Sequence, residues 1–240
     1  MQGARSHRAP VTAVDIKFAG RRLYLITGSM DHTVSIWVSE REDRGPVSLP
    51  AHPVATLCVH LDAVTRLVAS PALDAVVSAS LDGTVVLSSL RRAMPLRHLH
   101  LLCPNGQPTD MVLLAEDHLV AYTAQNKTLE ALTLNDRPLS HAEVEEELSL
   151  LRPAPSGGFV MGCVRESHEI LVWQVSTMEL TERFVGAPGP MLDLILLDKE
   201  RALCGFGEDG QVVCFRTRAT EYDEEDNRDV MEKLHHAGFV

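Results

Sequence analysis

The chain has 240 residues, of which 45% are hydrophobic, and its formal net charge is −11 at pH 7. This length accommodates one sizeable domain or two small ones. The negative charge disfavours non-specific binding to nucleic acid or to anionic membranes, and no apolar run reaches the ~18 residues that a membrane span needs.

The first predicted elements are four β-strands between residues 11 and 59. VTAVDIKF, RLYLITGS and TVSIW each alternate apolar and polar residues, and PVATLCV supplies the fourth strand after the loop SEREDRGPVSLP. Alternation with period two, with glycine, aspartate and proline at the junctions, is typical of β-hairpins. Residues 63–102 repeat this order with AVTRLVAS, DAVVSAS, TVVLSSL and PLRHLHLL.

One later segment, SHAEVEEELSLL at residues 140–151, has two interpretations. A helix beginning at Ser140, with Glu143 as the partner in a capping box, is one of them. The spacing of the repeats favours the other, a loop followed by a strand at ELSLLRPA.

The strands belong to a repeat. GSMDHTVSIW, ASLDGTVVLS and GEDGQVVCF align on Asp31, Asp82 and Asp209, and the weaker copies AQNKTLEAL and RESHEILVW lie between the last two. The five anchors are spaced by 51, 44, 41 and 42 residues, with Asn126 and Ser167 as the anchors of the weaker copies. A period of ~40–45 residues is the signature of four-stranded propeller blades.

These residues resemble the WD-repeat family from residue 7 to about residue 216. In that family a histidine, a strand hydroxyl, an aspartate and a tryptophan form a hydrogen-bonded chain within a blade, and buried polar groups need such partners. In the first repeat, Thr27 or Ser29 would supply the hydroxyl. In the second repeat, Ser88 stands at the position of the tryptophan. The expected structural residues are His7, Ser29, Asp31, Trp37, His60, Ser80 and Asp82. The resemblance thus implies that Asp31 holds a turn and is not a general base.

The order of the units is similar to the C-terminal WD region of BEACH-domain proteins of the neurobeachin type. The resemblance rests on four features in chain order: a clear repeat, an inserted loop, a second repeat containing SPALDAVVSASLDGTV, and then weaker repeats. It implies a non-catalytic protein-interaction scaffold for vesicle or membrane-protein trafficking. We expect a cytoplasmic protein, peripheral to membranes through its partners. A substrate-recognition propeller of a ubiquitin ligase or similar assembly is the alternative.

The expected fold is an all-β WD40 propeller of about five four-stranded units over residues 1–218, followed by an acidic tail over residues 219–240. No fourth strand follows VVCFRTRAT, and no BEACH or PH-like module is present. Because full closure of the ring removes exposed sheet edges, five units predict an incomplete ring. We therefore expect a fragment or truncated product whose missing blades come from a longer chain; a genuine small propeller is the alternative.

The motifs that could indicate catalysis or the binding of a metal or cofactor are weak, so we expect neither an enzyme nor a bound metal or cofactor. His98 and His100 share one face of a strand, but no third metal ligand is near. GFGEDG lacks the lysine and the helix of a phosphate loop, and the five cysteines form no CxxC, as in a reduced cytosolic protein. The expected partners are other proteins, with neither nucleic acid nor direct membrane insertion.

Two turn residues are the candidates for partner binding. In WD propellers, docking usually involves the face that carries the turns between the second and third strands of each blade. Met30 and Leu81 each precede the aspartate of such a turn, where a polar residue is expected. Exposed apolar patches often mark interfaces; the alternative is that each side chain folds over its own blade.

Overall fold

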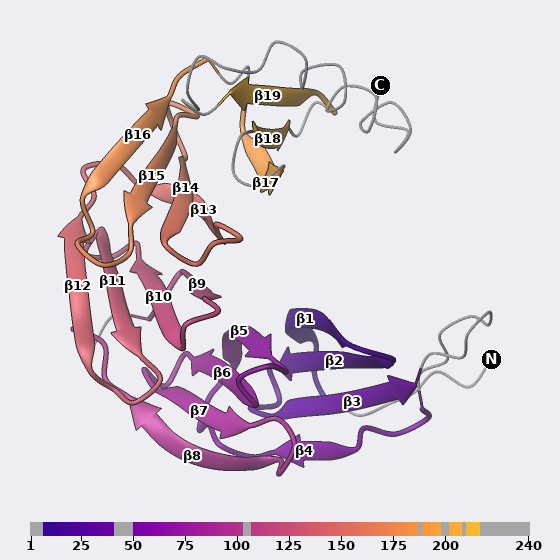
Figure 1. Cartoon of the computed structure of the whole chain (residues 1–240). Coiled ribbons are helices and arrows are strands. Elements are labelled where there is room, and N and C mark those ends of the chain that lie inside the picture. Colours follow the sequence, from indigo (N-terminus) through magenta and orange to yellow (C-terminus); the bar gives the residue numbers. More distant parts are fainter. Residues whose placement is uncertain are drawn as a thin grey trace. The chain divides into compact units, whose positions relative to one another are not determined.

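The computed structural model describes residues 7–40, 50–102, 107–186, 189–197, 202–207 and 210–216. These residues form 19 strands and contain no helix (Figure 1). The all-β prediction is therefore confirmed for the described part of the chain. The chain divides into two compact units, one of Met1–Glu145 with Ser176–Met178 and one of Glu146–Val175 with Glu179–Val240.

The first unit contains three four-stranded antiparallel sheets, in each of which neighbouring strands are consecutive in the chain. The first sheet comprises β1 (Val11–Ala19), β2 (Arg22–Ser29), β3 (Val34–Glu40) and β4 (Ala55–Leu57). The second comprises β5 (Val64–Ser70), β6 (Ala75–Ser80), β7 (Val85–Ser89) and β8 (Met94–Leu99). The third comprises β9 (Asp110–Leu113), β10 (His118–Thr123), β11 (Thr128–Thr133) and β12 (Pro138–Glu143).

The second unit contains one sheet of four strands and one of three. The fourth sheet comprises β13 (Leu148–Pro153), β14 (Phe159–Val164), β15 (Ile170–Gln174) and β16 (Leu180–Phe184). The fifth comprises β17 (Met191–Leu197), β18 (Ala202–Gly207) and β19 (Val212–Arg216). The expected acidic tail lies outside the described residues, as does Asp209, the anchor of the last repeat.

The strands predicted for the first two sequence repeats are confirmed, and the helix from Ser140 is not formed. Its residues are divided between β12 and β13, so the strand expected at ELSLLRPA is present. The start of the segment is a strand as well, where a loop was expected. Pairing between β11 and β12 explains the difference, because it satisfies backbone groups that a helix would otherwise have to satisfy internally.

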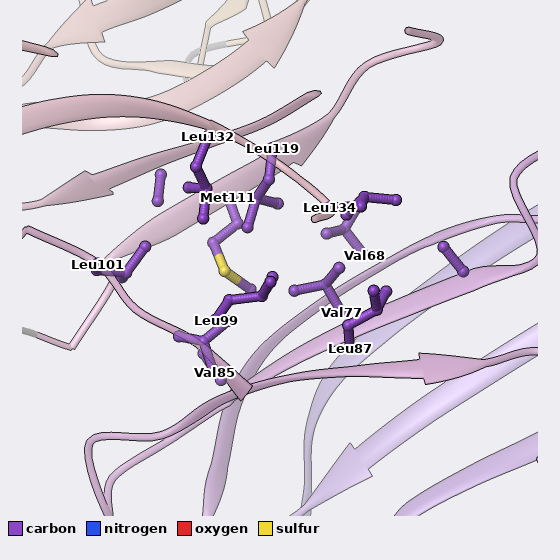
Figure 2. Close-up of a cluster of buried hydrophobic side chains, with 13 residues drawn as sticks. Val68, Val77, Val85, Leu87, Leu99, Leu101, Met111, Leu119, Leu132 and Leu134 are labelled. Atoms are coloured by element: carbon purple, nitrogen blue, oxygen red, sulfur yellow. The ribbon is translucent and has the colours of Figure 1, made fainter. Parts of the chain in front are cut away.

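Apolar side chains from facing sheets form the core. Between the second and third sheets, Leu87 and Leu99 lie opposite Met111 and Leu119 (Figure 2). Between the first and second sheets a similar cluster includes Ile26, which is fully buried. Each strand turns alternate residues to opposite faces, so the inner strands bury both faces and read as nearly continuous apolar runs.

Close approach of the first two sheets depends on Gly28 in β2. A Cβ atom added there would lie 2.5 Å from Cγ1 of Val64 and 3.1 Å from a methyl group of Leu67. Real Cβ contacts are not that short, so only glycine permits this packing distance.

Candidate functional site

A chain of hydrogen bonds links the segment before β1 to the turn between β2 and β3. Nδ1 of His7 lies 3.1 Å from Oδ2 of Asp31, and its Nε2 lies 2.8 Å from Oγ1 of Thr27. The indole N–H of Trp37 donates to the same Thr27 oxygen at 3.3 Å. This network fits a histidine whose Nδ1–H donates to the carboxylate and whose Nε2 accepts the threonine proton.

Ser29, an expected structural residue and one of the two hydroxyls that the sequence offered, has another role. Its Oγ donates to the carbonyl oxygens of Ala9 and Pro10, at 3.1 and 3.0 Å, and accepts the backbone N–H of Asp31. Thr27 and Ser29 share one face of β2 because they are two residues apart. Thr27 is the one that reaches His7, whereas Ser29 fastens the chain just before β1.

The Asp31 carboxylate is held in its charged form. Burial by itself raises its pKa, but hydrogen bonds from Thr33, from the backbone N–H of Arg8 and from His7 together lower that pKa to about 2. Thr33 contributes both its hydroxyl, at 2.6 Å, and its backbone N–H, at 3.1 Å. A carboxylate saturated by donors in this way fixes a turn and has little capacity to accept a proton as a base.

The second sheet repeats the arrangement with one member changed. Nε2 of His60 lies 2.7 Å from Oγ of Ser78, and Nδ1 lies 2.8 Å from Oγ1 of Thr84 and 3.8 Å from Oδ2 of Asp82. The expected hydroxyl, Ser80, instead donates to the carbonyl of Asp62 at 2.9 Å. As in the first sheet, the hydroxyl two residues earlier in the strand is the one that meets the histidine.

Burial and hydrogen bonding shift the pKa values of the histidine and the aspartate in the second sheet. Burial lowers the pKa of His60, against the opposing effect of Asp82, and therefore favours the neutral imidazole. Burial raises the pKa of Asp82, but donors from Thr84 and Leu61 lower it overall. Ser88, which stands where the first sheet has Trp37, is buried and its Oγ lacks a partner.

Glu130 is a buried acid that the sequence patterns did not single out. It lies on β11 of the third sheet, is 3% exposed, and accepts the backbone N–H of Leu102 at 2.7 Å through Oε2, while Oε1 is unpaired. Burial raises its pKa. Like His7 and His60, this side chain fastens the segment that enters its sheet. The one sequence signal was an acid within the apolar strand TLEAL.

The two candidates for partner binding lie on exposed turns. Met30 is 50% exposed and Leu81 is 46% exposed. Their backbone N–H groups bond to the carbonyls of Pro10 and Ala63, which places the two residues equivalently in the first and second sheets. Leu61, 87% exposed, was missed; its N–H bonds to Asp82 at 2.6 Å, beside the turn that carries Leu81. Met30, Leu61 and Leu81 are called the turn surface below.

Within the described residues, no cluster of three or more histidine, cysteine or acidic side chains could hold a metal ion. Of the pair considered as metal ligands, His100 contacts Asp136, with Nδ1 2.6 Å from Oδ2, and no further ligand joins them. Nor does this part of the chain include a helix long and apolar enough to cross a membrane.

Consecutive four-stranded antiparallel sheets that pack face to face and repeat a histidine–hydroxyl–aspartate chain define the blades of a β-propeller. The sequence matches the family model of the neurobeachin beta propeller domain over residues 1–223, and the chain belongs to that family. The expected relation to BEACH-domain proteins is thereby confirmed.

Two known proteins illustrate the relation. The chain is 26% identical over 231 residues to BEACH domain-containing protein B of Arabidopsis thaliana, an alignment that covers 90% of this chain and 9% of that protein. The chain thus spans less than a tenth of that relative. The crystal structure of the computationally designed Ika8 protein is similar with a TM-score of 0.61, covering 88% of this chain and 72% of the designed one. At 17% identity this second likeness concerns the fold alone.

Proposed function

We propose that the chain is a non-catalytic scaffold that binds other proteins through its turn surface, as part of a BEACH-type protein in vesicle or membrane-protein trafficking. The observation that carries the proposal is the exposure of Met30, Leu61 and Leu81, at or beside turns where the backbone N–H of each residue is hydrogen-bonded. Apolar side chains held out on ordered turns favour a protein partner. The chain acts in the cytoplasm and reaches membranes through its partners.

The ionisable side chains near this surface support the same proposal. Asp31 and Asp82 accept several donors each, and His60 is buried between two hydroxyls. Groups whose hydrogen-bonding capacity is filled within the fold stabilise it and have no capacity left for a substrate. We therefore assign His7, Asp31, Trp37, His60 and Asp82 a structural role, together with Thr27 and Ser78.

The blade arrangement belongs to the proposal as well. Five sheets, the last with three described strands, support a count of about five blades over residues 1–218 in an incomplete ring, with residues 219–240 as an acidic tail. The family supports a longer parent chain that carries further blades, because the aligned relative extends far beyond this region.

A pull-down from cell extract tests the function. The wild-type chain is compared with a Met30→Glu, Leu81→Glu double variant, each immobilised on beads, with bound proteins identified by mass spectrometry. Leu139→Glu is the matched control, because Leu139 is an exposed apolar residue on β12, away from the turns. Circular dichroism establishes that all three chains are folded.

The proposal predicts that the double variant loses vesicle-associated partners that the control retains. An unchanged partner list would remove Met30 and Leu81 from the binding site. Recovery of ubiquitin-ligase subunits in place of trafficking proteins would contradict the trafficking role and favour the alternative assembly.

A further inference from the structure

The second sheet and the segment that follows it carry positive charge within a strongly acidic chain. Residues 63–102 contain no lysine or glutamate, and their charged residues are two aspartates and four arginines, Asp74, Asp82, Arg66, Arg91, Arg92 and Arg97. The chain as a whole has a net charge of −11. Three of the four arginines lie on the hairpin of β7 and β8, so the positive charge is concentrated at one edge of the sheet.

β8 is an exposed edge strand. Among the described strands it is hydrogen-bonded to β7 alone, at the end of the strand order of its sheet (Figure 1). Its first five residues, 94–98, are all exposed, whereas the outer strands β12 and β16 each contain half-buried residues. The second sheet packs against the first with one face and against the third with the other. The exposure of its edge therefore does not depend on any further blade.

The arginines at this edge lack acidic partners. Within the described residues, no ion pair involves Arg91, Arg92, Arg97 or, in the neighbouring turn between β11 and β12, Arg137, and all four are exposed. Only Arg91 donates a side-chain hydrogen bond, to the carbonyl of Pro71 at 3.4 Å. Elsewhere an aspartate or glutamate pairs with each of Arg22, Arg66, Arg152, Arg165 and Arg183. The guanidinium groups of the edge thus keep their capacity to bind carboxylates.

The end of β8 meets the turn between β11 and β12. Asp136 in that turn accepts the backbone N–H of His100 at 2.7 Å, and its Oδ2 lies 2.6 Å from Nδ1 of the same residue. Burial raises the pKa of Asp136, but these bonds and the charges of His100 and Arg97 lower it overall. Arg97 thus lies close to the turn that carries Arg137. The side chains of Arg91, Arg92, Arg97 and Arg137 are called the arginine edge below.

We propose that the arginine edge binds an acidic, extended segment of a partner protein, whose carboxylates pair with the guanidinium groups. The six residues of β8 span roughly 20 Å at ~3.3 Å per residue, so a segment of about six residues covers the strand. Met94 and Leu96, 46% and 51% exposed, lie between the arginines and would contact apolar side chains of the segment. These apolar contacts favour a polypeptide over a nucleic acid or a lipid headgroup. The proposal goes beyond the turn surface, because it involves no residue of that surface.

The acidity of the rest of the chain does not prevent this binding. At physiological ionic strength the Debye length is about 8 Å, so distant acids are largely screened from a ligand on β8. The nearest acids already have donors within the fold. Asp136 accepts bonds from His100, and Asp74 accepts the backbone N–H of Arg91 and the hydroxyl of Ser89, each at 2.7 Å. The local charge that a ligand meets is therefore that of the arginines.

Fluorescence anisotropy of a labelled peptide, measured with the full chain at physiological ionic strength, tests the proposal. The probe is a peptide of about six residues that combines glutamate with leucine, and its control has glutamine in place of glutamate. Wild type is expected to bind the glutamate probe and to bind the glutamine probe more weakly. Arg92→Glu combined with Arg97→Glu is expected to weaken binding of the glutamate probe roughly tenfold, because each reversal replaces attraction by repulsion.

A second double variant, Arg22→Glu with Arg165→Glu, is the matched control. It gives the chain the same net charge but changes arginines that already have acidic partners, so it is expected to bind the glutamate probe like wild type. All four substituted side chains are exposed, so the circular dichroism spectra of the variants should coincide with that of wild type.

Three results would overturn the proposal: a wild-type chain that does not bind the glutamate probe, equal binding of the two probes, or equal weakening in the two double variants. Binding to phosphatidylserine vesicles in place of the peptide would overturn it in favour of a membrane surface. The Met30→Glu, Leu81→Glu variant is expected to bind the probe like wild type. The turn surface and the arginine edge can therefore fail separately.

Discussion

The first two sheets each bind their entering segment through a network of polar side chains, and the two networks differ in one member. In both, a histidine from the entering segment bonds to a hydroxyl on the second strand and lies beside an aspartate at the next turn. In the first sheet Trp37 extends the chain by donating to Thr27, whereas in the second Ser88 is buried without a partner. The histidine, hydroxyl and aspartate are therefore the shared core of the arrangement, and the tryptophan is an addition to it.

The third sheet sharpens this comparison. There Glu130 accepts the N–H of Leu102 in the segment that leads to the sheet. An acid on the third strand thus fastens the entering chain where the first two sheets use a histidine. What the fold requires is a buried polar link between the entering segment and the sheet, and several residue types meet that requirement.

The largest expected effect comes from removing the shared core. His60→Ala deletes a side chain with no exposed surface and removes the histidine that contacts the hydroxyls of Ser78 and Thr84, of which Thr84 keeps its bond to Asp82. The cavity and the lost hydrogen bonds together are expected to lower the free energy of unfolding by roughly 3 kcal/mol. Urea denaturation followed by circular dichroism measures it. A loss no larger than that of an exposed control, Glu116→Ala, would contradict the shared core.

A smaller effect separates the two sheets directly. Trp37→Phe removes the indole donor while keeping most of the apolar bulk, and is expected to cost about 1 kcal/mol. Ser88→Ala removes a buried hydroxyl that has no partner, so it is expected to leave stability unchanged or raise it slightly. The two variants are compared by urea denaturation under the same conditions. A clear loss from Ser88→Ala would mean that its hydroxyl has a role that the comparison denies.

The smallest expected effect is on the dependence of stability on pH. Burial lowers the pKa of His60 from its ordinary value of 6.5. The unfolded chain then binds the proton more readily than the folded chain, so the stabilising contribution is complete above pH 6.5 and is lost as the pH falls below it. Unfolding free energies at pH 7 and pH 5 should differ less in His60→Gln than in wild type. An equal difference in both would assign the effect to other groups.

Much of the fold followed from the sequence, because alternation and the repeat spacing report directly on strands. The same alternation could not choose between Thr27 and Ser29, which share a face of β2. The choice depends on where the entering segment meets the strand, and the pairing of β1 with β2 is irregular there, between Val11 and Ala13. Local sequence patterns do not indicate such a shift in register.

Glu130 and Leu61 were missed for different reasons. The repeat that contains Glu130 has Asn126 in place of the aspartate, and His100, in the segment between β8 and β9, contacts Asp136 instead, so a search for the histidine–aspartate pair passes over this repeat. Leu61 follows His60 directly, and a residue next to a predicted buried histidine gives no local sign that it is 87% exposed. Both depend on how the entering segments lie against the sheets, which only the three-dimensional structure provides.

The free energy of unfolding of Asp31→Ala tests the central claim most directly, which is that the polar chains are structural. Asp31 accepts bonds from His7, Thr33 and the backbone of Arg8. Removing the carboxylate takes away the acceptor that those donors share, so the account predicts a loss of ~1–3 kcal/mol relative to wild type at pH 7. A variant whose urea denaturation curve coincides with that of wild type would contradict the claim.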